Sequence, residues 1–286
     1  MSSRTQLYPI IINGGNVVSG SNNAIYRYQF PVGSVRFNKS KVAVSSISMY
    51  YSWYNILASS DNNTFSYVWY SSSGSVTEII TIPDGFYSIS EINSYLQSQM
   101  ISNGHYLVDS SGNYVYYLEF VTNSTYYSIQ LNSYPIPTSL PSGWTNPASI
   151  TFPAVATTPQ VTISANAFRD IIGFNAGTYP AAVQTTTYSK LSDYTPQVTP
   201  VQSVILSCTL LNNKYSNPGT ILYAFSPAGT NFGSIIQSNP SEFSFVDIQD
   251  GNYNTFDIAF LDQNFNYLPI NDSNLVVQLL IETPNE

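Results

Sequence analysis

The sequence predicts an all-β fold: an antiparallel eight-stranded jelly-roll sandwich with an inserted β-rich region that carries one or two short helices. The first observation is composition, because 24 Tyr and 15 Phe accompany many Val, Ile and Thr residues, whereas Lys and Glu are scarce. Aromatic and β-branched residues favour strands, and Lys and Glu favour helices. The second is a series of strand-like runs separated by turns rich in Gly, Pro, Asn and Ser, which is typical of antiparallel sandwiches.

The order of these runs indicates three parts. Residues 1–22 are polar, contain the flexible turn signal Asn13-Gly14-Gly15, and are predicted to form an N-terminal arm. Residues 23–82 and 201–286 contain enough strands for one jelly-roll domain. Residues 83–200, between a Pro-Asp-Gly turn and a Pro-rich connector, are then an insertion region.

Within the first block, apolar alternation ends at turn residues each time. The predicted strands are 24–30, 41–54, 65–70 and 76–82. In the last block the predicted strands are 201–211, 220–225, 242–248, 255–261 and 274–281, with one helical turn at 231–237.

The insertion region contains the one long helical pattern of the chain. Ser88 is a suitable N-cap with Glu91 three residues later as a capping box, and Asn103-Gly104 ends the helix. Ser90 is an alternative cap. Further along, the sequence predicts a hairpin (114–121 and 126–131), a long loop or weak edge strands (133–160), a strand (161–163), a short helix (166–172) and a connector (176–200).

The charge of the chain is unusually low. Only 8 % of residues are charged and the net charge is −8, which argues against a nucleic-acid-binding protein. The densest basic group is Arg36, Lys39 and Lys41, too small for such a surface but able to form a weak basic spot. An AT-rich genome explains part of the Asn, Ile and Tyr content but not the scarcity of Lys. A surface with so few charges is poorly protected against association and suits a subunit packed against neighbours.

No catalytic, cofactor-binding or metal-binding residues are predicted. His105 is the only histidine and follows a helix stop, so an exposed loop position is expected. Cys208 lies in an apolar run and is expected to be a small buried hydrophobe, which leaves no intrachain disulfide. One His and one Cys do not supply a zinc site. Asp247 and Asp250 fit a turn between strands better than a calcium loop.

The aromatic residues allow two interpretations. Trp53, Trp69, Trp144 and the doublets 50–51, 116–117 and 126–127 would, in strands, point to both faces of a sheet. Core packing on one side and inter-subunit contact on the other is the favoured interpretation. A sugar-binding face is the other. The sequons at Asn38, Asn62, Asn123 and Asn271 are expected by chance in so Asn-rich a chain.

Neither a signal peptide nor a transmembrane segment is predicted, because the apolar run near the N-terminus (8–12) is short. We therefore expect synthesis and assembly in the host cytoplasm.

Three segments resemble a known family. They are residues 82–96 (IPDGFYSISEINSYL), residues 167–174 (AFRDIIGF), and the closing pair 256–262 (FDIAFLD) and 274–281 (NLVVQLLI). In the same order, similar segments occur in penton proteins, the minor capsid proteins of virophages, polinton-like viruses and related elements. The resemblance implies a virion protein that forms homopentamers at icosahedral vertices, beside a major capsid protein with a double jelly roll. It carries over no contact residue.

Self-association and the major capsid protein are thus the expected partners, and the insertion is expected to cap the vertex or contact a host-surface receptor. The resemblance implies no cofactor and no enzymatic activity. One alternative is a carbohydrate- or receptor-binding β-sandwich such as a fibre head or spike, and another is an all-β hydrolase.

Overall fold

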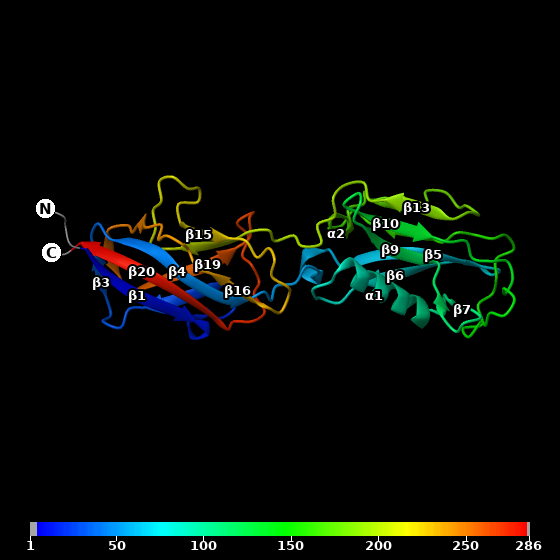
Figure 1. The fold of residues 1–286 in the computed structure, drawn as a ribbon, viewed down its shortest axis with the longest axis horizontal. Helices are drawn as coiled ribbons and strands as arrows, with labels where there is room; N and C mark the ends of the chain where they lie inside the picture. Colours follow the sequence, from blue (N-terminus) through cyan, green and yellow to red (C-terminus); the bar gives the residue numbers. More distant parts are fainter. Residues whose placement is uncertain (1–4, 285–286) are drawn as a thin grey trace. The chain divides into compact units, whose positions relative to one another are not determined.

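The computed structural model describes residues 5–284, which form two compact units (Figure 1). The jelly-roll unit comprises the chain up to Trp53 and again from Val201 onward. The inserted unit comprises Tyr54–Pro200. The chain therefore leaves the jelly-roll unit once and returns to it once.

Two antiparallel sheets build the jelly-roll unit. The first has the order β1-β20-β4-β16, with β17 also paired to β4: β1 (Thr5–Asn13), β20 (Leu275–Pro284), β4 (Lys41–Tyr50), β16 (Ile235–Ser238) and β17 (Val246–Asp247). The second has the order β15-β14-β19-β2: β15 (Ile221–Phe225), β14 (Val204–Cys208), β19 (Thr255–Leu261) and β2 (Ile25–Gln29). A short ribbon pairs β3 (Val35–Phe37) with β18 (Gly251–Tyr253), and the turn η1 (Gly14–Asn16) follows β1.

This strand order is that of a jelly roll. The pairs β1–β20, β2–β19, β4–β16 and β14–β15 are nested in the sequence, as if one long hairpin were rolled up, and alternate pairs fall into alternate sheets. The predicted fold class is confirmed. The inserted unit interrupts the chain between β4 and β14, at the turn of that long hairpin.

Alternating apolar residues form the core of this unit. Along β20, Val277, Leu279 and Ile281 are buried, and their neighbours are partly or fully exposed. In β4 the buried positions change parity, because Ser45 is an extra residue where the pairing to β20 shifts. This β-bulge turns Ile47 and Met49 inward after Val42 and Val44.

Two predicted boundaries are corrected by the structure. The segment predicted as an arm (1–22) contains β1, because Ile10 and Ile12 are buried and the strand pairs with β20 along its length. Residues 54–82, predicted as part of the jelly roll (23–82), belong to the inserted unit. Their aromatic residues Phe65, Tyr67 and Trp69 are buried in its core. The helical turn predicted at 231–237 is wrong as well, since residues 235–237 belong to β16, a strand that pairs with β4.

Three small sheets and two helices make up the inserted unit. One sheet has the order β12-β11-β5-β6: β12 (Gly177–Tyr179), β11 (Gln160–Ile163), β5 (Thr64–Ser71) and β6 (Gly74–Thr81). Another has the order β13-β10-β9: β13 (Tyr188–Leu191), β10 (Ser128–Ser133) and β9 (Leu118–Asn123). The third pairs β7 (Leu107–Val108) with β8 (Tyr114–Val115), and the remaining elements are η2 (Ala58–Ser60), α1 (Ile89–Ser102) and α2 (Phe168–Ile172).

Both predicted helices are present. Helix α1 has Ser88 as its N-cap: the Ser88 side chain accepts from the Glu91 N–H, and the Glu91 carboxylate accepts from the Ser88 N–H. Ile92, Leu96 and Met100 turn inward and pack into the core of the inserted unit. Gly173 ends α2 in the left-handed conformation that favours glycine.

Irregular segments of the inserted unit are held by buried amides. Asn55 donates to the carbonyl oxygens of Tyr87 and Val198, each at 2.7 Å, and accepts from the Tyr87 N–H at 2.8 Å. Asn62 donates to the Asn55 carbonyl and accepts from the Leu57 N–H. A neutral amide satisfies the buried backbone without the desolvation cost of a charge.

Candidate assembly surface

The structure buries His105, which contradicts the predicted exposed position. Its ring is 8 % exposed and stacks on Trp69 with centroids 4.6 Å apart. Nδ1 lies 2.8 Å from the Tyr67 hydroxyl, which also accepts from the Asn103 amide. Burial lowers the pKa of His105 from 6.5 to about 4. His105 is therefore a neutral side chain packed against aromatic rings in the core, and this geometry indicates no catalytic role.

The other titratable candidates also have structural environments. Cys208 is buried, as predicted, and burial raises the pKa of its thiol to about 12. Asp250 accepts from the Lys39 N–H at 2.7 Å in the turn between β17 and β18. Within residues 5–284, no group of three His, Cys, Asp or Glu side chains is placed to hold a metal ion, and no helix is long and apolar enough to cross a membrane.

The aromatic candidates divide between core and surface. Trp53 and Trp69 are buried and Trp144 is half-buried, so these indoles do not form an open platform. Tyr117 is buried beside the half-buried Tyr116. The doublet 126–127 lies in the turn between β9 and β10 rather than in a strand, so both its rings are exposed.

The outer face of the first sheet carries few charges. Outward positions of its three longest strands follow from pairing: Pro9 opposite Leu280, Ile11 opposite Gln278, and Val276 opposite Ser48. Ile11 is 58 % exposed. Charges appear only in the end row, where Glu282 and Lys41 pair, followed by Asp247. A four-stranded face with few charges and with exposed aliphatic side chains is typical of an interface.

Sequence reasoning missed this face because it assigned β1 to an arm. The run 8–12 is apolar at every position, so it shows no alternation between the two faces. Three consecutive Ile residues in this run favour a strand, and an apolar residue at every position is typical of a strand whose two faces are both covered.

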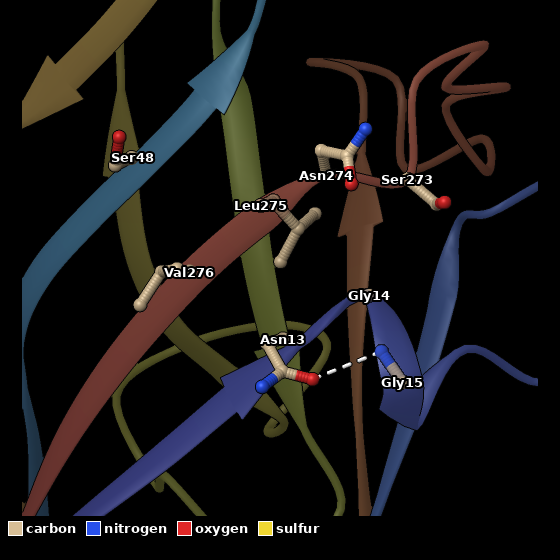
Figure 2. A pocket seen from close by; sticks show the side chains of 8 residues that line it. All are labelled: Asn13, Gly14, Gly15, Ser48, Ser273, Asn274, Leu275 and Val276. Carbon is tan, nitrogen blue, oxygen red and sulfur yellow. Dashed lines mark hydrogen bonds between the residues drawn. The ribbon is translucent and has the colours of Figure 1, made fainter.

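A shallow pocket of about 450 Å³ lies at the end of this face (Figure 2). Asn13 accepts from the Gly15 N–H there, and a side chain at Gly14 would meet the Ser273 carbonyl at 2.7 Å. The other lining residues are neutral, namely Ser48, Asn274, Leu275 and Val276. We interpret the pocket as the junction of the β1 turn with the loop before β20.

A cluster of tyrosines lies on the inserted unit. Tyr114 stands between Tyr106 and Tyr116, with ring centroids 5.3 Å and 6.4 Å away. All three project from one side of the β7–β8 hairpin, since Tyr106 precedes and Tyr116 follows the paired residues. Tyr114 is 54 % exposed.

Comparisons with known proteins give structural likenesses alone. No family model matches the chain, and no curated protein matches it. The chain is similar to the mavirus penton protein (9 % identity, TM-score 0.47, over 99 % of this chain and 100 % of that one). It is also similar to a chain in the Sputnik virophage structure (14 % identity, TM-score 0.39, over 98 % of both chains). The first of these bears the name of the family that the three sequence segments resemble.

Proposed function

We propose that this chain is a viral capsid protein that forms homopentamers at the icosahedral vertices, next to the major capsid protein. The observation that carries the proposal is the jelly roll whose first sheet, across β1, β20, β4 and β16, presents an outer face with charges in one end row alone among the described residues. Three sequence segments resembling penton proteins support it, as does the low charge of the chain.

Assembly in this proposal works by burial. Ile11, Val276 and Ile235 are exposed aliphatic side chains on the outer face, and covering each of them contributes about 1 kcal/mol per copy. The neutral side chains between them lose little on desolvation compared with charges. In a closed ring the same contact is repeated between every pair of neighbours, so the free energy gained by burial is repeated as well. Assembly of this kind requires no catalytic residue.

Native mass spectrometry of the purified full chain tests the proposal. We expect a species of about five times 31.6 kDa, and larger assemblies when the major capsid protein of the same virus is added. Ile11→Asp places a charge on the outer face and should abolish the pentamer. Val183→Asp places the same charge at an exposed position of the inserted unit and should leave the pentamer intact.

A wild-type chain that stays monomeric or trimeric at every salt concentration, alone and with the major capsid protein, contradicts the proposal. An Ile11→Asp variant that forms normal pentamers excludes the outer face as the contact. Hydrogen exchange measured by mass spectrometry on both variants checks that β1 still pairs.

Contact with a host-surface glycan is a second candidate function, favoured by the tyrosine cluster on the inserted unit. Aromatic faces stack on sugar rings, and Tyr114 is the most exposed ring of the cluster. A glycan array with wild type and Tyr114→Ala tests this. Binding that is lost in Tyr114→Ala supports it, and a blank wild-type array contradicts it.

A further inference from the structure

A groove of about 880 Å³ lies at one end of the jelly-roll unit. It is lined by the beginning of β1, the end of β2, β3 with the residues after it, and the end of β20. Ile10, Phe30 and Phe37 form its buried floor, and Val32 stands at its rim with 78 % of its side chain exposed. The groove therefore has an apolar floor and room for several side chains.

The groove also holds cationic side chains that the fold does not use. Arg36 and Lys39 both line it, and neither forms a salt bridge with any residue in 5–284. The whole chain has 8 Lys and Arg against 16 Asp and Glu, so two cations in one apolar groove are a local reversal of its charge. Arg27 in β2 is, by contrast, already paired, because both carboxylate oxygens of Asp257 accept hydrogen bonds from it at 2.8 Å.

Backbone groups beside the groove are available for pairing. Among the described residues, β1 pairs with β20 alone and β3 pairs with β18 alone, so each strand has an open edge. An open strand edge accepts an extended peptide as an additional strand, while neighbouring pockets take its alternate side chains.

We propose that this groove binds an extended segment of a partner protein in which carboxylate side chains flank an aromatic or large aliphatic residue. The apolar residue would pack onto the floor that Phe30 and Phe37 form, and the carboxylates would pair with Arg36 and Lys39. Two cations and an apolar floor fit such a peptide better than nucleic acid, which requires a larger basic surface. The groove lies within one copy, so this proposal does not rest on the pentamer.

Selection of a random dodecapeptide phage library on the immobilised full chain tests the proposal. Four proteins are compared: wild type, the double variant Arg36→Gln with Lys39→Asn, Val32→Trp, and Lys214→Gln. Asn suits position 39 because that residue has a positive φ. Val32→Trp blocks the rim and keeps both charges, whereas Lys214→Gln removes an exposed charge elsewhere in the same unit.

We expect wild type and Lys214→Gln to enrich peptides with Asp or Glu beside Phe, Leu or Ile. The selected consensus peptide, labelled and measured by fluorescence anisotropy, should bind the double variant and Val32→Trp at least tenfold more weakly. A 20-base-pair DNA duplex serves as competitor and should not displace it.

Any of three results overturns the proposal: no enrichment on wild type, an acidic consensus that the double variant selects equally well, or displacement by the DNA duplex at a concentration similar to that of the peptide. Circular dichroism and the mass of the assembled chain, measured on each variant, separate loss of this site from loss of folding or of pentamers.

Discussion

The two units solve the same problem, a β-rich core with few charges, by different means. The jelly-roll unit relies on long strand ladders and alternating apolar side chains. The inserted unit has shorter strands and long irregular segments, and buried polar side chains fix their backbone. Of the buried polar residues in 5–284, Ser40 and Ser52 belong to the jelly-roll unit, and the others to the inserted unit: Asn55, Asn62, Asn63, His105, Ser133, Thr158 and Gln160.

This difference shows what a neutral polar composition can support. Long ladders satisfy their own N–H and C=O groups, so their side chains are free to be apolar. In irregular segments some backbone N–H and C=O groups have no strand partner, and short amide and hydroxyl side chains form hydrogen bonds with them in the interior. The inserted unit should therefore respond to loss of single polar groups, and the jelly-roll unit to loss of volume.

The largest effect is expected from Phe260→Ala in the jelly-roll unit. Phe260 is fully buried and meets the edge of Tyr26, with ring centroids 6.0 Å apart. Its truncation leaves a cavity and should lower the free energy of unfolding by about 4 kcal/mol. Hydrogen exchange by mass spectrometry should show the loss of protection in β2, β14 and β19, with the inserted unit unchanged. Phe265→Ala, at an exposed ring, is the control. Equal loss of protection in both units would mean that they unfold together.

Asn55→Ala should give the next largest effect, now in the inserted unit. It leaves two carbonyls and one N–H without their partner, at about 1 kcal/mol each, so a loss of about 3 kcal/mol is expected. The same exchange experiment locates the loss, and Asn264→Ala, at an exposed loop position, is the control. A change below about 1 kcal/mol would show that water replaces the amide.

Acid should destabilise the inserted unit through His105. Its pKa is about 4 in the folded protein and 6.5 as the ordinary value, so the unfolded chain binds the proton first. Stability is full above pH 6.5 and falls as the pH decreases toward 4, by about 2 kcal/mol between pH 7 and pH 5. Urea unfolding at these pH values measures the loss. His105→Gln should remove most of it, and a pH dependence that survives in this variant would assign the effect to other groups.

The smallest effect is expected from Ser88→Ala at the N-cap of α1. Loss of the capping box should lower the stability of the inserted unit by about 1 kcal/mol. Ser94→Ala, on the exposed side of the same helix, should stabilise it slightly because Ala is the better helix former. Thermal unfolding of both variants shows whether the unfolding temperature falls for Ser88→Ala and rises for Ser94→Ala. A Ser88→Ala variant as stable as wild type would show that Ser90 can replace the cap.

Local signals predicted much of the fold. The capping box at Ser88, the turn between the strands predicted at 65–70 and 76–82, and the alternation in β19 each depend on neighbours in sequence, and each was predicted at or near its observed place. The fold class was also predicted, although the strands expected at 65–70 and 76–82 belong to the inserted unit and β1 was assigned to an arm.

Contacts between residues that are distant in the sequence could not be predicted from local patterns. Strands β5 and β6 have the same alternation as jelly-roll strands, and long-range contacts assign them to the inserted unit: the pairing of β5 with β11 and the packing of Phe65 against Phe168. His105 follows a helix stop, yet Trp69, distant in sequence, covers it. The groove at Arg36 and Lys39 likewise combines strands from both chain ends, so the sequence showed its charges without its walls.

The amide of Asn55 also bears on how the chain folds. By bonding to the Val198 carbonyl, it brings the first and last residues of the inserted unit within one hydrogen bond of each other. Once that unit has folded, β4 and β14 are joined by a short tether instead of a free loop running from residue 51 to residue 203. The entropy of closing so long a loop is then removed from the later search of the jelly-roll strands for one another. We therefore expect the inserted unit to fold first and to set the rate at which the two halves of the jelly roll meet.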